Sequence, residues 1–136
     1  MSLFTVFDIA GSSMSAQSVR LNTTASNLAN AGNVASTPEE AYRGRHPVFQ
    51  TLMRDGANSS SVGVSVRNII ESELPPNRVY EPGHPMADAD GYIYMSNVNN
   101  MDEMIELISA SRSYQNSVEV LNTSKQLMQR TLAVGR

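Results

Sequence analysis

The sequence predicts a mainly α-helical chain, in which an N-terminal and a C-terminal helix pair as an antiparallel coiled coil around a small β-rich insert. Apolar residues recur at alternating spacings of three and four between about residues 100 and 134. A second stripe, spaced by seven, occupies the first thirty residues. Because a narrow heptad stripe is completed by another helix rather than by a sheet, we expect the two ends of the chain to pair.

The first helix is predicted over residues 4–31 by spacing and not by helix propensity. Its two rows are Phe7, Met14, Leu21 and Leu28, and Ala10, Gln17, Thr24 and Ala31. Serine, threonine and asparagine fill much of the rest, at a combined cost of about 4 kcal/mol relative to alanine. An isolated helix with this deficit is mostly unfolded, so its order must come from packing. Gly32 and Asn33 supply a C-terminal stop.

Charge is almost absent from this first helix. Residues 1–34 carry only Asp8 and Arg20. The surface helix of a free monomer usually shows a charged face, whereas this one shows Ser, Thr, Asn and Gln, which neighbours can bury with hydrogen bonds. The stripes are compatible with a core within one molecule or with contacts between molecules, and the polar faces favour the second reading.

The middle of the chain has the pattern of short strands and extended loops. Residues 33–60 form a polar connector, in which Pro47 argues for extended chain or a short strand over 42–49. A turn or a flexible tip is expected at 57–61. Val62, Val64 and Val66 alternate with Gly63 and Ser65, which is the period of a half-exposed strand.

A rigid loop and a second short strand follow. The proline- and glycine-containing loop 82–91 ends in an Asp90-Gly91 turn, and residues 92–95 are predicted as a strand. The last helix, 100–134, is expected to begin with Asn100 as its N-cap, with Asp102 and Glu103 in the first turn. Its predicted seam consists of Met104, Ser111, Val118, Lys125 and Leu132, with Leu107, Tyr114, Leu121 and Met128.

These elements divide the chain into an N-terminal helix of the coiled-coil domain (1–34), a strand and loop segment (35–99) and a C-terminal helix of the same domain (100–136). The 136 residues are enough for one domain. Cysteine is absent, and the net charge is −3 without a basic stripe, which argues against nucleic acid and anionic membranes as partners. No apolar run suits a transmembrane helix, and the N-terminus lacks the pattern of a cleaved secretion signal.

Catalytic and metal-binding patterns are weak, so we expect no enzyme, no cofactor and no metal site. Asp88, Asp90 and Gly91 resemble part of a calcium loop, but the remaining ligand positions do not fit its register. His46 and His84 each precede a proline in a predicted loop or extended stretch and have no nearby cysteine. A small metal-binding module using these histidines and aspartates is the weaker alternative.

Four stretches carry a resemblance to a known family. Residues 15–21 with 25–30, and residues 110–116 with 120–127, resemble the N- and C-terminal signatures of bacterial flagellar axial proteins. Within that family, residues 42–49, and 84–92 with 97–99, are similar to the corresponding stretches of a proximal-rod subunit. The resemblance covers nearly the whole chain.

The resemblance implies a structural subunit of the proximal rod in the flagellar basal body. Such subunits are exported unfolded by the flagellar type III apparatus without signal cleavage, and they build a periplasmic tube whose inner layer is formed by the terminal helices. The implied partners are other rod proteins, the rod–MS ring junction protein, the MS ring and further copies of the chain. A distal-rod or hook-junction subunit is the alternative within the family.

The residues expected at the assembly interface come from both terminal helices. Asn27, Asn30 and Asn122 are expected to bridge neighbouring subunits through their side-chain amides. The full predicted set is Phe7, Met14, Leu21, Asn27, Leu28, Asn30, Met104, Leu107, Tyr114, Val118, Leu121, Asn122 and Met128.

Overall fold

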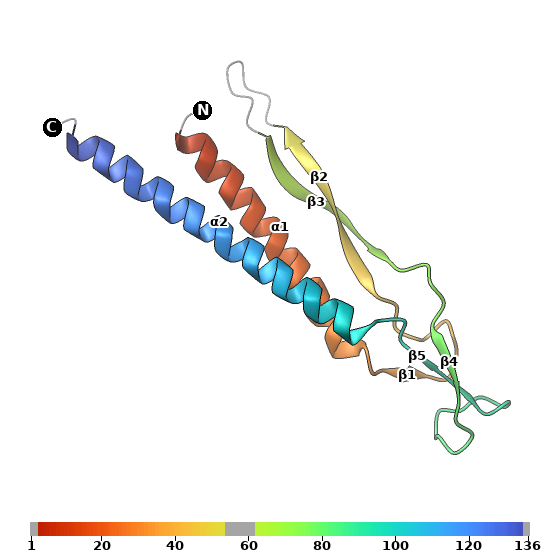
Figure 1. The fold of residues 1–136 in the computed structure, drawn as a ribbon. Helices are drawn as coiled ribbons and strands as arrows, with labels where there is room; N and C mark the ends of the chain where they lie inside the picture. Colours follow the sequence, from red (N-terminus) through yellow and green to blue (C-terminus); the bar gives the residue numbers. More distant parts are fainter. Residues whose placement is uncertain (1–2, 54–61, 135–136) are drawn as a thin grey trace.

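The computed structural model describes residues 3–53 and 62–134, and two long helices dominate it. Helix α1 (Leu3–Asn30) and helix α2 (Asn100–Val134) lie side by side and run in opposite directions, so that both chain ends are at the same end of the molecule (Figure 1). The bounds agree with the predicted helices to within one residue. The expected turn at 57–61 lies outside the described residues.

The beginning of α2 corrects the predicted N-cap by one residue. The Asn99 side chain, and not that of Asn100, accepts a hydrogen bond from the Met101 N–H at 3.0 Å. The Asn99 amide in turn donates to the Asp102 carboxylate at 2.9 Å. Asn99 therefore satisfies one of the free N–H groups at the start of the helix, and Asp102 holds its side chain in place.

Two small antiparallel sheets form the middle segment. Strand β2 (Arg45–Met53) pairs with β3 (Val62–Glu71) as a hairpin, and the register shifts between Val48 and Phe49. Strands β1 (Val34–Ala35), β5 (Tyr92–Met95) and β4 (Asn77–Tyr80) form a sheet in the order β1-β5-β4. The predicted strand 92–95 is confirmed, β3 is longer than the valine pattern indicated, and β4 was not predicted.

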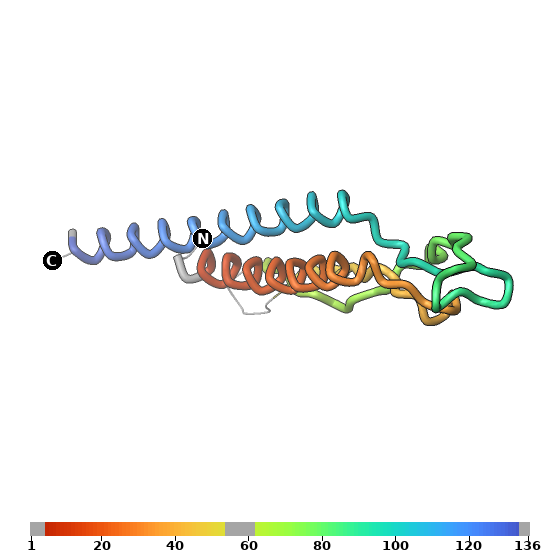
Figure 2. The backbone as a smooth tube through the Cα atoms, turned by 90° about the horizontal axis from the view of Figure 1, so that it is seen from below, coloured from red at the N-terminus to blue at the C-terminus, as the bar shows by residue number. Residues whose placement is uncertain are grey.

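The helices and the hairpin form three layers with α1 in the centre. Figures 1 and 2 together show α2 on one side of α1 and the hairpin on the other. The hairpin packs on α1, and no close approach joins it to α2 within the described ranges. The β1-β5-β4 sheet extends beyond the end of the helix pair, opposite the two chain termini.

Gly63 sets the distance between the hairpin and α1. A Cβ at this position would lie 2.8 Å from the Ser12 Oγ, and the same hydroxyl oxygen accepts the Val64 N–H at 3.2 Å. Ser65, two residues along and therefore on the same face, has its hydroxyl oxygen enclosed. The residues of β3 that face α1 here are thus small.

The loop before β5 is organised by the Asp88 carboxylate. It accepts hydrogen bonds from the backbone N–H groups of Tyr92 (2.8 Å) and Asp90 (3.0 Å) and from the Tyr94 hydroxyl (3.2 Å). These bonds, led by that from Tyr92, hold the pKa of Asp88 below its usual value. Gly91 takes a positive φ of 79°, which the turn requires. Asp88 therefore shapes a turn.

Candidate assembly interface

Small residues occupy the centre of the contact between the two helices. Ala10 of α1 lies beside Ser117 and Val120 of α2. Ala110 and Ser124 of α2 are buried against α1, with Ala110 0% exposed. Apart from Ile93, every buried hydrophobic residue in the described part of the chain is an alanine. The helices therefore approach closely, and most large apolar side chains stay outside the buried centre.

The row of α2 that faces α1 differs by one residue from the predicted seam. Glu103, Ala110 and Ser124 are buried, and Ser117 at the same spacing of seven bonds to Ser13. Met104 is 49% exposed, and Lys125 and Leu132 are also exposed. The prediction placed large apolar residues in the seam, but closely packed helices need small ones there. The companion row is half-buried beside the contact: Leu107, Tyr114, Leu121 and Met128.

Two polar bridges join the helices along this contact. The hydroxyl groups of Ser13 and Ser117 are 3.0 Å apart. Nearer the other end, the Arg20 Nε donates to the Glu106 Oε2 at 3.0 Å, and the guanidinium and carboxylate form an ion pair. Both bridges can form only at one position of α1 along the axis of α2. They therefore fix how the two helices are aligned, which contacts between alanines alone would not determine.

Asn27 is the main polar junction of the molecule and is 0% exposed. Its amide nitrogen donates to the Arg45 carbonyl at 2.8 Å and to the Glu103 Oε1 at 3.1 Å. Its carbonyl oxygen accepts from the Arg45 N–H and the Tyr42 hydroxyl, both at 2.9 Å. One side chain thus ties α1 to α2, to the start of β2 and to the connector before it.

This geometry corrects the role expected for Asn27. Both donors and two acceptor sites of its amide are engaged within the chain, so none remains to bridge a neighbouring subunit. Asn30 is also engaged locally, since its amide donates to the Ser26 carbonyl at 2.8 Å and its oxygen accepts from Asn33 at 2.8 Å. Asn122 is exposed on α2.

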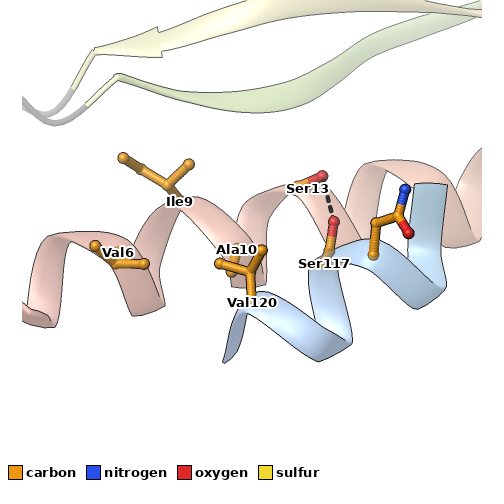
Figure 3. A pocket seen from close by; sticks show the side chains of 7 residues that line it. Val6, Ile9, Ala10, Ser13, Ser117 and Val120 are labelled. Atoms are coloured by element: carbon orange, nitrogen blue, oxygen red, sulfur yellow. Dashed lines mark hydrogen bonds between the residues drawn. The ribbon is translucent and has the colours of Figure 1, made fainter. Parts of the chain in front are cut away.

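The remaining predicted interface residues lie at the border of the helix pair. Phe7, Met14, Leu21 and Leu28 are half-buried on α1, and Val118 is half-buried on α2. Near the N-terminal end of α1, a hollow of about 370 Å³ opens between the helices, lined by Val6, Ile9, Ala10, Ser13, Asn116, Ser117 and Val120. Figure 3 shows Val120 beside Ala10, with Ile9 directed towards the hairpin.

The chain exposes much more surface than a compact protein of its mass. Its accessible area is 9306 Å² for 14.8 kDa, against roughly 7,000 Å² for a typical globular monomer. The difference of about 2,300 Å² is of the size that obligate interfaces bury. The exposed residues include large apolar side chains on α2 and on the hairpin.

The described residues contain no group of three or more His, Asp or Glu side chains able to hold a metal ion. The His84 Nδ1 accepts the Met86 N–H at 3.1 Å, which is a turn contact. The structure therefore does not bring the two histidines and the two aspartates together as a ligand set. No helix in ranges 3–53 and 62–134 is sufficiently long and apolar to span a membrane.

The sequence patterns missed three members of the Asn27 junction: Tyr42, Arg45 and Glu103. The available signal was the heptad of small or polar residues at 103, 110, 117 and 124, which runs parallel to the apolar row one residue away. Nothing local in the sequence indicated that Arg45 would contribute its backbone rather than its side chain.

The structure defines an elongated subunit with a minimal core, whose helices leave apolar borders for neighbours to cover. Comparison of the sequence with known protein families agrees with a protein that assembles with others. The family described as "Flagella basal body rod protein" matches residues 7–34, and "Flagellar basal body rod FlgEFG protein C-terminal" matches residues 89–134.

Similar proteins extend over the whole chain. The "Flagellar basal-body rod protein FlgC" of Escherichia coli O6:H1 is 52% identical over 136 residues, which is 100% of both chains. The protein of the same name from Salmonella typhimurium LT2 is 50% identical with the same coverage. That of Buchnera aphidicola subsp. Schizaphis graminum is 42% identical over 99% of each chain. The chain belongs to the FlgC family of flagellar basal-body rod proteins.

Proposed function

We propose that this chain is a structural subunit of the proximal rod of the bacterial flagellar basal body. In this role it assembles with other rod proteins into the helical tube that transmits torque and encloses the export channel. The role is structural and involves no catalysis. The observation that carries the proposal is the large accessible surface around an alanine-based core, which neighbouring subunits would bury.

The helix pair serves as the inner, coiled-coil layer of the tube. Residues 1–34 and 100–136 form this domain, and residues 35–99 form the segment outside it. Half-buried Phe7, Met14, Leu21 and Leu28 on α1, with Leu107, Tyr114, Val118, Leu121 and Met128 on α2, contact neighbours along the borders of the pair. Met104 and Asn122 are exposed and extend this surface.

Export and position follow from the same role. The chain crosses the inner membrane unfolded through the flagellar type III apparatus, keeps its N-terminus and assembles in the periplasm. The low helix propensity of α1 supports this route, because the helix becomes stable only when it is packed. Its neighbours are further copies, other rod proteins, the rod–MS ring junction protein and the MS ring.

The experiment places a charge at the border of the helix pair. In cells that lack the native chain, Leu28→Asp or Leu121→Asp is expected to abolish incorporation into basal bodies and motility, while the chain is still exported. Ala89→Asp is the matched control, since it adds the same charge at an exposed loop position and should leave motility intact. Full motility with either leucine variant would refute the proposal.

The position along the rod is tested separately. Labelling the chain in purified basal bodies should place it next to the MS ring. A label at the distal rod or at the hook junction would retain the axial role and reject the proximal position.

A further inference from the structure

The β2–β3 hairpin turns its apolar face away from α1. Gly63 and Ser65 point towards α1, so the alternation of a strand directs the valines between them to the opposite side. Cross-strand partners continue this surface, because Phe49 pairs with Val66 and Met53 with Val62. We call it the outer hairpin face: Phe49, Thr51, Met53, Val62, Val64 and Val66. Met53 is 74% exposed.

A second apolar surface lies on the first turns of α2. We call it the α2 stripe, and it consists of Met101, Met104, Ile105 and Ile108, of which Met101 is 68% exposed. Because α1 lies between α2 and the hairpin (Figure 2), the outer hairpin face is not covered by the α2 stripe of its own chain.

We infer that the outer hairpin face of one copy binds the α2 stripe of a neighbouring copy. This inference rests on the proposed role as a self-assembling subunit. When two copies bind through two different surfaces, one copy keeps its α2 stripe free and the other keeps its outer hairpin face free. Further copies can therefore be added at both ends, as a helical assembly requires.

Charge favours this pairing. Arg67 is left without a cross-strand partner where the register shifts next to Val66, so the strict alternation of the strand is interrupted there. It is exposed, and its side chain has no hydrogen-bond or ion-pair partner among the described residues. Asp102 adjoins the α2 stripe and is exposed, with the uncharged Asn99 amide as its side-chain contact. An Asp102 carboxylate placed at Arg67 would give each group a partner of opposite charge.

The spacing of the two surfaces agrees with this alignment. With Asp102 at Arg67, Ile105 and Ile108 lie about 5 and 9 Å further along the helix. Val64 lies about 10 Å from Arg67 along β3, so the isoleucines cover the valines. The neighbour's α2 then runs opposite to β3, as α2 does within each chain. The two copies therefore point in the same direction, as subunits of a tube do.

The area explains why this contact would form only during assembly. Each surface exposes on the order of 200 Å² of apolar side chain, at about 30–60 Å² for each half-exposed residue. Together they bury about 400 Å², whereas a stable isolated complex needs about 1,200 Å² or more. The contact is therefore too small for a dimer in dilute solution and adds to the other contacts in the rod.

Cysteine pairs test the contact directly, because the chain has no cysteine of its own. The pair Phe49→Cys with Ile105→Cys is introduced into the full chain, and basal bodies are purified and oxidised. The inference predicts bands at multiples of the chain mass. The control pair is Phe49→Cys with Gln126→Cys. Gln126 lies on roughly the same face of α2 as Ile105 but about 32 Å further along the helix, so this pair should give no such bands.

Each outcome decides a separate point. Incorporated chain that stays monomeric on oxidation overturns the inference and leaves the rod role standing. A disulfide to a protein of a different mass would show that the outer hairpin face or the α2 stripe binds another protein, and not a second copy of this chain. Absence of the unmodified chain from basal bodies overturns the proposed function itself.

A second experiment exchanges the two charges. Arg67→Asp or Asp102→Arg should each reduce motility, and the double variant should restore it. If the double variant is no more motile than the single variants, the proposed alignment is rejected.

Discussion

Replacing Asn27 by alanine should release the hairpin from the helix pair. The change removes four hydrogen bonds and leaves the Arg45 N–H and carbonyl without the partner that satisfies them. An unpaired buried polar group costs about 1–3 kcal/mol. The Tyr42 hydroxyl and the Glu103 carboxylate are on side chains that can turn towards water. We therefore expect a loss of about 2–4 kcal/mol, most of it from the two Arg45 groups.

Hydrogen exchange at the Arg45 amide measures this loss, since that N–H donates to the Asn27 oxygen at 2.9 Å. A loss of 2–4 kcal/mol corresponds to exchange about 30- to 1,000-fold faster, measured in purified basal bodies on a peptide that covers residues 42–49. Tyr42→Phe removes a single donor and should cost about 1 kcal/mol. Asn122→Ala is the control at an exposed asparagine and should change exchange little.

Asn27→Asp separates the two halves of the junction. The aspartate keeps the acceptor for the Arg45 N–H and the Tyr42 hydroxyl, but it loses both donors and places a second carboxylate against Glu103. Repulsion between like charges should make this variant at least as disruptive as alanine at neutral pH and less so in acid, where one carboxyl is protonated. Unchanged Arg45 exchange in both Asn27→Ala and Asn27→Asp would refute the central position of this amide.

Two further outcomes follow from close contacts. Gly63→Ala should weaken the hairpin contact with α1 by about 1–3 kcal/mol, because the added Cβ would lie 2.8 Å from the Ser12 Oγ. Gly83→Ala is the control, since a Cβ added there would have no atom within 4 Å. Equal hydrogen exchange of the β3 amides in the two variants would contradict this prediction. Since the folded pKa of Asp88 is lowered, its contribution to the loop is present above the unfolded value of about 3.9 and is lost as the pH falls through the folded value. Exchange at β5, corrected for the intrinsic rate, should therefore rise on acidification below pH 4, and Asp88→Asn should abolish that pH dependence.

The sequence was sufficient for the two helices because their periodicity is long, and because polar residues mark the end of α1 at Gly32-Asn33 and the start of α2 at Asn99-Asn100. It was insufficient for the seam. Met104 and Ala110 both lie on rows spaced by seven, and hydrophobicity alone favours the row of Met104. The choice depends on how closely the helices approach, and that distance is set by contacts with α1 that no local pattern contains.

The hairpin illustrates the same limit. Alternating valines predict a strand with one apolar face, but not the direction in which that face points. Gly63 decides this, because it allows the Ser12 side chain of α1 to approach the backbone. The bridging role expected for Asn27 was wrong for a related reason, since a helical asparagine can bond within its own chain or to another one. Whether the asparagine is buried within its own chain decides between the two kinds of hydrogen bond, and burial depends on tertiary packing that local sequence does not contain.

The small core and the polar junction serve one requirement if the chain is exported unfolded. Large apolar side chains buried within the subunit would stabilise it alone and oppose unfolding before transport. Alanine contacts contribute little. The Asn27 amide is costly to remove because its partners are left unpaired, but its net contribution to folding is smaller, since its hydrogen bonds replace hydrogen bonds to water. In the proposed role, the hairpin and helices would therefore acquire a defined geometry without a stable fold of the free chain. Most of the stabilisation is then left to the large apolar residues at the borders, which are buried only when a neighbour arrives.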